Sequence, residues 1–188
     1  VLDDGLLTHA YVAARIEEAP GVALFELAVD AAVLSRTPLE VWDLTRPQAH
    51  WRFDEVRLTA DARVDEPARV LAGLARTRVL AALQVAAEQV GGAAQCLQLA
   101  VDYTKERVQF GKPVASFQAV KHRAAEMMVR METARSTVLG VAARVAQGAQ
   151  GNGLDDAALA AEVAAARVQA TEAYRYCAQE AIQLHGGV

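Results

Sequence analysis

The sequence has few of the residues that build metal centres or covalent cross-links. Only two cysteines occur among 188 residues, Cys96 and Cys177, and neither has the paired spacing of a metal or redox motif. We therefore expect two free, buried thiols and a reducing, cytoplasmic compartment. The Glu-x-x-His pairs of a di-iron bundle are missing, and His122 with Glu126, one turn apart, has no second pair. A metal site is not expected, because such sites need three or four ligands.

Long apolar runs are also missing. The most apolar windows, residues 79–87 and 138–143, reach about half of the roughly 20 residues that a membrane-spanning helix needs, and arginines flank them. The chain begins Val-Leu-Asp-Asp-Gly, without a start methionine, a basic segment or a cleavage pattern. We expect neither a membrane span nor a signal peptide, and the first residues read as an entry partway through a longer chain.

Glycine, proline and basic residues are too few for several other classes of protein. Twelve glycines and five prolines exclude collagen-like and linker-like chains, and 53% hydrophobic against 22% charged residues excludes a disordered chain. The net charge of 19 − 23 = −4 argues against a nucleic-acid binder. No Gly-x-Gly-x-x-Gly, Gly-x-Ser-x-Gly or P-loop string occurs. What remains is a folded chain of one large or two small domains with a substantial core.

Charge divides the chain into two parts. Residues 1–66 hold 13 acidic and 6 basic residues, a net charge of −7, whereas residues 67–188 hold 10 acidic and 13 basic residues, a net charge of +3. The aromatic residues that fall in the first part are Phe25, Trp42, Trp51 and Phe53, together with Tyr11. The second part is rich in Ala, Val, Leu, Gln and Arg. We predict a domain boundary near Glu66-Pro67, which gives domains 1–66 and 67–188.

The first part has the pattern of an incomplete sheet. Its apolar or alternating runs are residues 6–14, 22–29 and 50–58, and turns that contain proline or glycine separate them. Three strands without closure leave exposed edges, so we expect further strands before Val1. We predict a partial antiparallel β domain.

From Pro67 onward, apolar residues recur at steps of three and four, as they do on amphipathic helices. The three predicted stripes are Leu83, Ala87, Val90, Ala94, Leu97 and Val101; Met127, Met131, Ala134, Val138, Val141 and Val145; and Leu159, Val163, Ala166, Ala170, Tyr174 and Cys177. Each helix has about 30 residues and is about 45 Å long. The short connections, residues 107–116 and 147–155, favour antiparallel neighbours. Close approach of alanine-rich faces explains how Gly91-Gly92 is tolerated inside a helix.

The predicted fold class is therefore α+β and mainly α. An antiparallel bundle with three of four long helices follows the partial antiparallel β domain. The chain ends at residues 185–188, where a fourth helix would begin.

The connection at residues 103–113 carries the clearest binding signal. Arg107 comes at a helix end and is followed by Gln109, Phe110, a glycine and a proline, an arrangement that can present a guanidinium and backbone groups to a phosphate. Ser116 is predicted to cap the next helix, whose N-terminal amides favour an anion, with Phe117 and Gln118 on its first turn. Basic residues at a helix end and a Gly-x-Pro sequence are also common where a helix simply ends. The alternative that this segment only connects two helices and binds no ligand stays open here.

The last residues form a second candidate. Gln183, Gly186 and Gly187 end a helix with an amide and two glycines, which permits close approach of a bulky ligand to bare backbone. A plain glycine C-cap would look similar. His185 is interpreted as a capping or packing residue rather than a catalyst, since no acid or nucleophile stands at a meaningful spacing.

These strings together resemble the acyl-CoA dehydrogenase family. The resemblance rests on Tyr-Thr-Lys-Glu-Arg-Val-Gln-Phe-Gly-Lys-Pro-Val-Ala-Ser-Phe-Gln-Ala-Val-Lys-His at 103–122, Ala-Glu-Met at 125–127 and Gln-Leu-His-Gly-Gly at 183–187. Asp-Leu-Thr-Arg at 43–46 and Phe-Asp-Glu-Val at 53–56 are similar to the family's middle β domain. The resemblance therefore covers essentially the whole chain.

The resemblance implies a flavoenzyme. Members bind FAD between a helical N-terminal domain, a middle β domain and a C-terminal four-helix bundle, and share it across a dimer interface. They oxidise an acyl-CoA thioester to the trans-2-enoyl-CoA; a glutamate removes the α-proton, hydride passes to the flavin, and an electron-transfer flavoprotein reoxidises the FAD. A homodimer or homotetramer is expected.

The resemblance also assigns roles to individual residues. The positions that match the family's contacts to the FAD of the neighbouring subunit are Arg107, Gln109, Phe110, Phe117, Gln118, Gln183, Gly186 and Gly187. A pyrophosphate carries the charge that a bidentate arginine recognises. Arg78 matches an arginine beside the CoA portion of the substrate.

Two departures from the family qualify this assignment. Ala75 stands where many members have an aspartate, and Thr77 stands where members with a relocated base have a glutamate. The catalytic glutamate is expected beyond Val188, so no catalytic residue is assigned within the chain, which is interpreted as a piece of a longer dehydrogenase. A non-catalytic partner subunit that contributes only FAD contacts is the alternative, and a cofactor-free helical module is a third reading. Acyl chain length and branching stay open.

Overall fold

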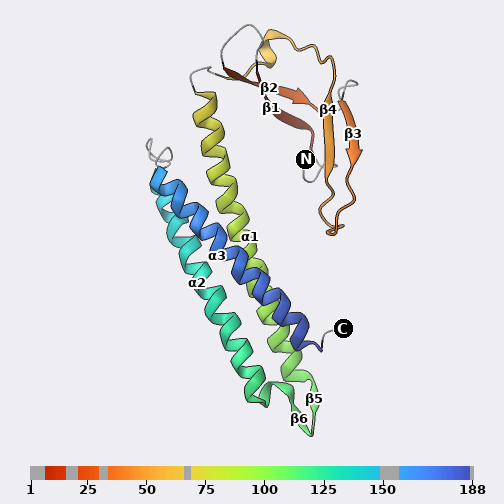
Figure 1. Ribbon diagram of the computed structural model, residues 1–188, viewed down its shortest axis with the longest axis vertical. Helices are drawn as coiled ribbons and strands as arrows, with labels where there is room; N and C mark the ends of the chain where they lie inside the picture. The colour runs from red at the N-terminus through yellow and green to blue at the C-terminus, as the bar shows by residue number, and fades with distance from the viewer. Residues whose placement is uncertain (1–6, 16–20, 30–33, 66–68, 149–156, 187–188) are drawn as a thin grey trace. The chain divides into compact units, whose positions relative to one another are not determined.

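The computed structural model describes residues 7–15, 21–29, 34–65, 69–148 and 157–186, and they form two compact units, residues 1–73 and 74–188 (Figure 1). Each unit is described by itself. The predicted boundary at Glu66-Pro67 falls on residues 66–68, which lie outside the described residues.

The first unit contains two antiparallel strand pairs. β1 (His9–Arg15) pairs with β2 (Val22–Ala28), and β3 (Leu34–Pro38) pairs with β4 (Ala49–Phe53). The predicted runs at 6–14 and 22–29 correspond to β1 and β2. The run at 50–58 was too long, because β4 ends at Phe53 and Glu55 takes a positive φ of 50°.

Strand β3 was not predicted. Its sequence, Leu-Ser-Arg-Thr-Pro, lacks alternation and ends on a proline. What holds it is its partner strand, since the Arg36 guanidinium lies 5.3 Å from the ring centre of Trp51 directly opposite and donates to the Val29 carbonyl. Such a cross-strand contact cannot be read from β3 alone.

Asp65 fastens the segment after β4 to β2. One carboxylate oxygen accepts a hydrogen bond from the Leu24 amide at 2.8 Å, and Arg63 donates to both oxygens at 3.0 Å. Hydrogen bonding from Arg63 holds the pKa of the Asp65 carboxyl below its usual range. The segment that leaves the short 3₁₀ helix η2 (Ala60–Ala62) is thereby fixed against the strand.

The second unit is built from three long helices. They are α1 (Val70–Glu106), α2 (Gln118–Gly148) and α3 (Ala157–Leu184), with α2 antiparallel to the other two (Figure 1). The predicted fold class, a mainly helical α+β chain with an antiparallel bundle, is confirmed. Because α1 and α3 run in the same direction, their C-terminal ends lie at the same end of the bundle.

Buried stripes follow the predicted spacing closely on two helices. All six predicted residues of α2 are buried, and on α3 only Tyr174 is exposed, with Ala173 buried in its place. On α1 the prediction was right in part. Val90 is buried and Leu83, Ala94 and Leu97 are half-buried against the clusters, whereas Ala87 is exposed and Ala86, Ala93 and Ala100 are buried instead. Small side chains on every face of α1 make the direction of its stripe ambiguous in the sequence.

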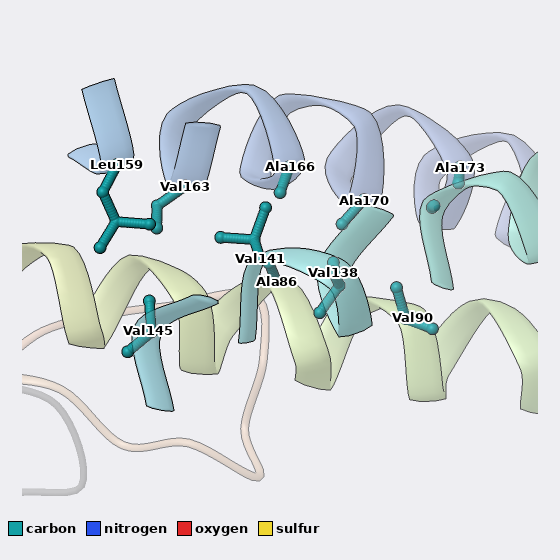
Figure 2. Close-up of a cluster of buried hydrophobic side chains, with 11 residues drawn as sticks. Ala86, Val90, Val138, Val141, Val145, Leu159, Val163, Ala166, Ala170 and Ala173 are labelled. Carbon is teal, nitrogen blue, oxygen red and sulfur yellow. The ribbon is translucent and has the colours of Figure 1, made fainter. Parts of the chain in front are cut away.

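Two apolar clusters form the core of the bundle. The first joins all three helices through small residues such as Ala86, Val138 and Val163 (Figure 2), and the second lies around Met127 and Cys177. Gly92 marks a close contact, because a Cβ there would lie 2.7 Å from the Tyr174 ring, whereas Gly91 has open space beside it. Only one glycine of the pair therefore serves the close approach that the sequence predicts.

Helix α1 is also long and apolar enough, by length and composition alone, to cross a membrane. The sequence windows did not single it out. Helices in the core of a bundle meet the same criterion, and here the buried alanines of α1 pack against α2 and α3. Only 11% of the apolar window of α1 is buried among the described residues, so packing against α2 and α3 accounts for only a small part of its apolar character.

Candidate functional site

A two-residue hairpin follows α1 and carries Arg107, Gln109 and Phe110. Its strands are β5 (Val108–Gln109) and β6 (Lys112–Pro113), and Phe110 and Gly111 take positive φ angles of 54° and 76°. Positive φ at both central residues defines a type I′ turn, which favours Asn or Gly. Gly111 suits it, but a phenylalanine in the left-handed region costs about 1–2 kcal/mol.

The strained residue also exposes its ring. The Phe110 side chain is 91% exposed and meets the Phe117 ring edge to face, with ring centres 6.2 Å apart. The Lys112 ammonium lies over the Phe117 ring at 4.3 Å. Backbone strain combined with an exposed aromatic ring is typical of a binding site rather than of a simple connection.

The start of α2 differs from the prediction. Ser116 lies in the 3₁₀ turn η3 (Val114–Ser116), and Phe117 is the residue before the first helical position, Gln118. The Phe117 carbonyl accepts from the amides of Val120 and Lys121. Ser116 is therefore not the helix cap, because the extra turn shifts the helix start by one residue. Phe117 and Gln118 nevertheless lie at the helix start, as predicted.

Ring stacking places the end of α3, which carries Gln183 and Gly186, beside the end of α1. The rings of Tyr103 and His185 stack at 4.3 Å between centres, with 25° between their planes. His185 comes after Gln183 at the end of α3, and Tyr103 lies one turn before Arg107, whose amide donates to the Tyr103 carbonyl at 2.9 Å. Gly186 takes a φ of 102°, as a glycine cap can, and Gly187 lies outside the described residues.

His185 has the capping and packing role that its sequence context suggests. Its Nδ1 lies 2.7 Å from the Ala181 carbonyl, and its ring packs on Tyr103. The partnership with Tyr103 was missed in the sequence. No local pattern could reveal it, because the two residues are 82 positions apart.

Several arginines of the bundle form ion pairs, and Arg107 is not among them. Arg123, Arg130, Arg135, Arg144 and Arg175 each pair with a glutamate on α2 or α3. In the part of the chain that the structure describes, the Arg107 guanidinium has no hydrogen bond or ion pair, and its side chain is exposed.

The local charge agrees with a negatively charged ligand. Residues 103–122 hold four basic residues and one acidic residue, a net charge of 4 − 1 = +3. An arginine without a partner among the described residues, the exposed ring of Phe110, the half-buried ring of Phe117 and glycine backbone in one place fit a ligand with a phosphate and a planar ring. The residues present therefore suit a dinucleotide.

Arg78 lies in a different place. It borders an open groove of about 290 Å³ between α1 and α3 that is otherwise lined by alanine and valine, including Ala75 and Val163. From Arg78 to the end of α1 at Glu106 the helix rises about 42 Å, at 1.5 Å per residue. Within one chain, Arg78 and Arg107 therefore cannot share a single binding site.

The thiols offer no reactive group. Burial raises the pKa of Cys177 to about 11, with a further contribution from Cys96, and burial raises the pKa of Cys96 as well. Both are free and protonated at neutral pH; Cys177 is buried as predicted, whereas Cys96 is only half-buried. Among the described residues, no group of three or more His, Cys, Asp or Glu side chains is placed to hold a metal ion.

Comparison with known proteins identifies the family. The model of the acyl-CoA dehydrogenase C-terminal domain matches residues 69–188. The chain is 39% identical over 154 residues to acyl-CoA dehydrogenase IpdE2 from Mycobacterium tuberculosis, which covers 82% of this chain and 41% of that protein. The chain belongs to the acyl-CoA dehydrogenase family.

Solved structures agree with this assignment. A glutaryl-CoA dehydrogenase in complex with glutaryl-CoA superposes with a TM-score of 0.84 at 25% identity, over 98% of this chain and 46% of that one. Butyryl-CoA dehydrogenase from Megasphaera elsdenii shares the fold with a TM-score of 0.85 at 24% identity, over 99% of this chain and 48% of that one. The chain thus spans less than half of the length of these relatives.

Proposed function

We propose that the protein to which this chain belongs oxidises an acyl-CoA thioester to the trans-2-enoyl-CoA, with FAD as cofactor and an electron-transfer flavoprotein as electron acceptor. The observation that carries the proposal is the Arg107 guanidinium, which has no partner among the described residues and is presented by a strained hairpin that the Tyr103–His185 stack joins to the end of α3. Membership of the family supports it.

The proposed cofactor contacts come from three short segments. Arg107 would bind the pyrophosphate through its positive charge. The side-chain amides of Gln109, Gln118 and Gln183 would donate hydrogen bonds to the adenosine part or accept them from it. The rings of Phe110 and Phe117 offer an apolar face to the adenine. The flavin, when bound, supplies the two-electron acceptor that amino-acid side chains lack.

We further propose that the cofactor is shared between two copies of the chain. The length of α1 supports this, because about 42 Å of helix separates Arg107 from Arg78, the proposed contact to the CoA portion. A nucleotide held at the Arg107 end would therefore serve the substrate groove of a neighbouring protomer. We therefore propose a homodimer or homotetramer, which this separation supports.

The proposed substrate site is the groove that Arg78 borders. Its cation suits a phosphate of CoA, and its alanine and valine lining suits apolar parts of a ligand. The groove lining contains no carboxylate, so the base that removes the α-proton must come from another part of the protein. We also propose a cytoplasmic location, supported by the two free thiols, which cell fractionation would test.

Cofactor binding by the natural protein tests the proposal. The wild-type protein should show visible flavin absorbance that an acyl-CoA substrate bleaches. Arg107→Gln should weaken FAD binding about 10- to 100-fold, the range expected for a lost charged hydrogen bond. Arg135→Gln removes an exposed arginine that pairs with Glu132, and it should leave FAD binding unchanged. A colourless wild-type protein that takes up no FAD would contradict the proposal.

A non-catalytic partner subunit is the second candidate. Ala75 favours it, because the groove there carries an alanine where many relatives have an aspartate. Such a subunit would bind FAD but turn over acyl-CoA only when an unlike subunit is added. Turnover by the purified homo-oligomer, measured over a series of acyl chain lengths, would exclude this role.

A further inference from the structure

The Tyr103–His185 stack connects two segments that the proposed function uses separately. Tyr103 lies in the last turn of α1, and its carbonyl accepts the Arg107 amide that begins the hairpin. His185 lies just past the last residue of α3, between Gln183 and Gly186. Both side chains are half-buried, so the contact excludes water on part of each ring.

The imidazole is fixed in orientation as well as in place. A carbonyl oxygen can only accept, so the 2.7 Å contact to Ala181 requires that His185 Nδ1 carries the proton. The His185 backbone amide also donates to the same carbonyl at 3.1 Å. Two contacts to one carbonyl hold the ring over the last turn of α3, where helices otherwise fray.

We propose that His185 and Tyr103 form a positioning pair that fastens the end of α3 to the end of α1, so that Gln183, Gly186 and Arg107 present one preformed nucleotide site. The proposal rests on the proposed function. A packing contact at this point converts two independently moving helix ends into one rigid surface, and preorganisation of that kind raises affinity without adding a contact to the ligand.

The structure supplies a matched control. Tyr176 on α3 is also half-buried, and its ring receives the Arg130 guanidinium at 4.3 Å from its centre. Replacing Tyr176 by leucine removes a ring and a favourable contact, as replacing Tyr103 does, but about two turns away from His185. If ring loss mattered only for the stability of the bundle, the two tyrosines would behave alike.

The experiment measures the Kd of FAD for the natural protein, prepared without cofactor, together with its Tm. Tyr103→Leu and His185→Ala should each raise the Kd about three- to tenfold, the range of an aromatic pair, and the double variant should be no worse than the single ones. Tyr103→Phe, which keeps the ring, should restore the wild-type Kd. Tyr176→Leu should lower the Tm but leave the Kd unchanged.

Hydrogen exchange provides a second readout. In the cofactor-free protein, His185→Ala should speed exchange at the amides of His185 and Gly186, whereas Tyr176→Leu should not. If Tyr103→Leu fails to fold, His185→Ala and His185→Phe at the helix end give the same test. His185→Phe keeps the ring and should retain most of the affinity.

The outcomes separate this inference from the proposed function. Wild-type protein that binds no FAD overturns both. FAD binding that Arg107→Gln weakens, while folded Tyr103→Leu and His185→Ala bind as tightly as wild type, overturns the positioning pair alone. A Kd that rises equally in Tyr176→Leu would also overturn it, because the effect would then be general.

Discussion

The helical unit and the β unit differ in how their buried apolar residues are joined, although both leave large apolar side chains exposed. In the helical unit, all three helices contribute buried alanines, valines or methionines to shared clusters. In the β unit, strands pair only in twos, and an apolar hollow of about 390 Å³ lies open between residues such as Phe25, Leu27 and Phe53. Trp42 is fully exposed.

The difference follows from where backbone hydrogen bonds are made. A helix satisfies its own amides and carbonyls within a few residues, so a segment of 28–37 residues can form and then pack. A strand needs a partner elsewhere in the chain, and an open pair of strands is only marginally stable. The helical unit should therefore contribute most of the free energy of unfolding. The stability of the β unit should depend mainly on single local contacts such as the hydrogen bonds of Asp65.

The largest expected effect is loss of core packing in the helical unit. Met127 is fully buried beside Cys177, so Met127→Ala should lower the free energy of unfolding by about 2–5 kcal/mol. The neighbouring Met128 is 56% exposed, and Met128→Ala should change it by less than about 0.5 kcal/mol. Urea unfolding measures both. Equal effects would mean that the core does not dominate stability.

The glycine pair of α1 also tests how tightly the helical unit is packed. Gly91→Ala, which meets nothing within 4 Å, should stabilise the helix by about 1 kcal/mol. Gly92→Ala places a methyl group against the outer end of the Tyr174 ring, which is partly exposed and must turn aside, so its net stabilisation should be smaller than that of Gly91→Ala. Thermal unfolding should therefore show a larger rise in Tm for Gly91→Ala than for Gly92→Ala. An equal rise would contradict the close contact.

Phe110 should separate stability from binding. Phe110→Asn places a residue that tolerates the left-handed region at φ 54° and should stabilise the hairpin by about 1 kcal/mol, while FAD binding weakens. Gly111→Ala, at φ 76°, is the control and should destabilise the hairpin. Hydrogen exchange of the hairpin amides and FAD titration measure the two effects. If Phe110→Asn stabilises the hairpin and FAD binding does not weaken, the strain at Phe110 has no role in binding.

The smallest expected effect concerns acid stability of the β unit. The pKa of Asp65 is lowered chiefly by its hydrogen bond from Arg63, so its stabilisation is fully present above about pH 4 and is lost as the pH falls through the lowered value. Asp65→Asn should therefore flatten the loss of stability below pH 4, and Arg63→Gln should do the same. The free energy of unfolding, measured between pH 5 and pH 2, tests this prediction. If its dependence on pH is the same in Asp65→Asn as in the wild type, Asp65 does not contribute to acid stability.

Much of the helical architecture could be predicted from the sequence. The six-residue stripe of α2 was predicted completely, because five of its six members are valine or methionine at regular helical spacing. The stripe of α1 was predicted only in part, since alanine on every face leaves the buried side poorly defined. In the β unit, β3 was missed because its pairing depends on Trp51 across the sheet rather than on its own pattern.

The sites show the same division. The resemblance pointed to Arg107, Phe110, Gln118 and Gln183 as residue types at fixed spacings, and the structure places the hairpin and the end of α3 together through Tyr103 and His185. The left-handed conformation of Phe110, and the lack of a partner for Arg107 within the part of the chain that the structure describes, could not be predicted. Both depend on how the chain turns after α1 and on which carboxylates lie within reach.

Periodicity and motif spacing are local properties of the chain, and they were enough to indicate the family, the three long helices and the chemical types of the site residues. Packing was needed to establish which side of α1 is buried, which glycine contacts Tyr174, and that the ends of α1 and α3 meet. Those outcomes depend on contacts between residues far apart in sequence, since α1 and α3 become neighbours only after α2 has reversed the direction of the chain.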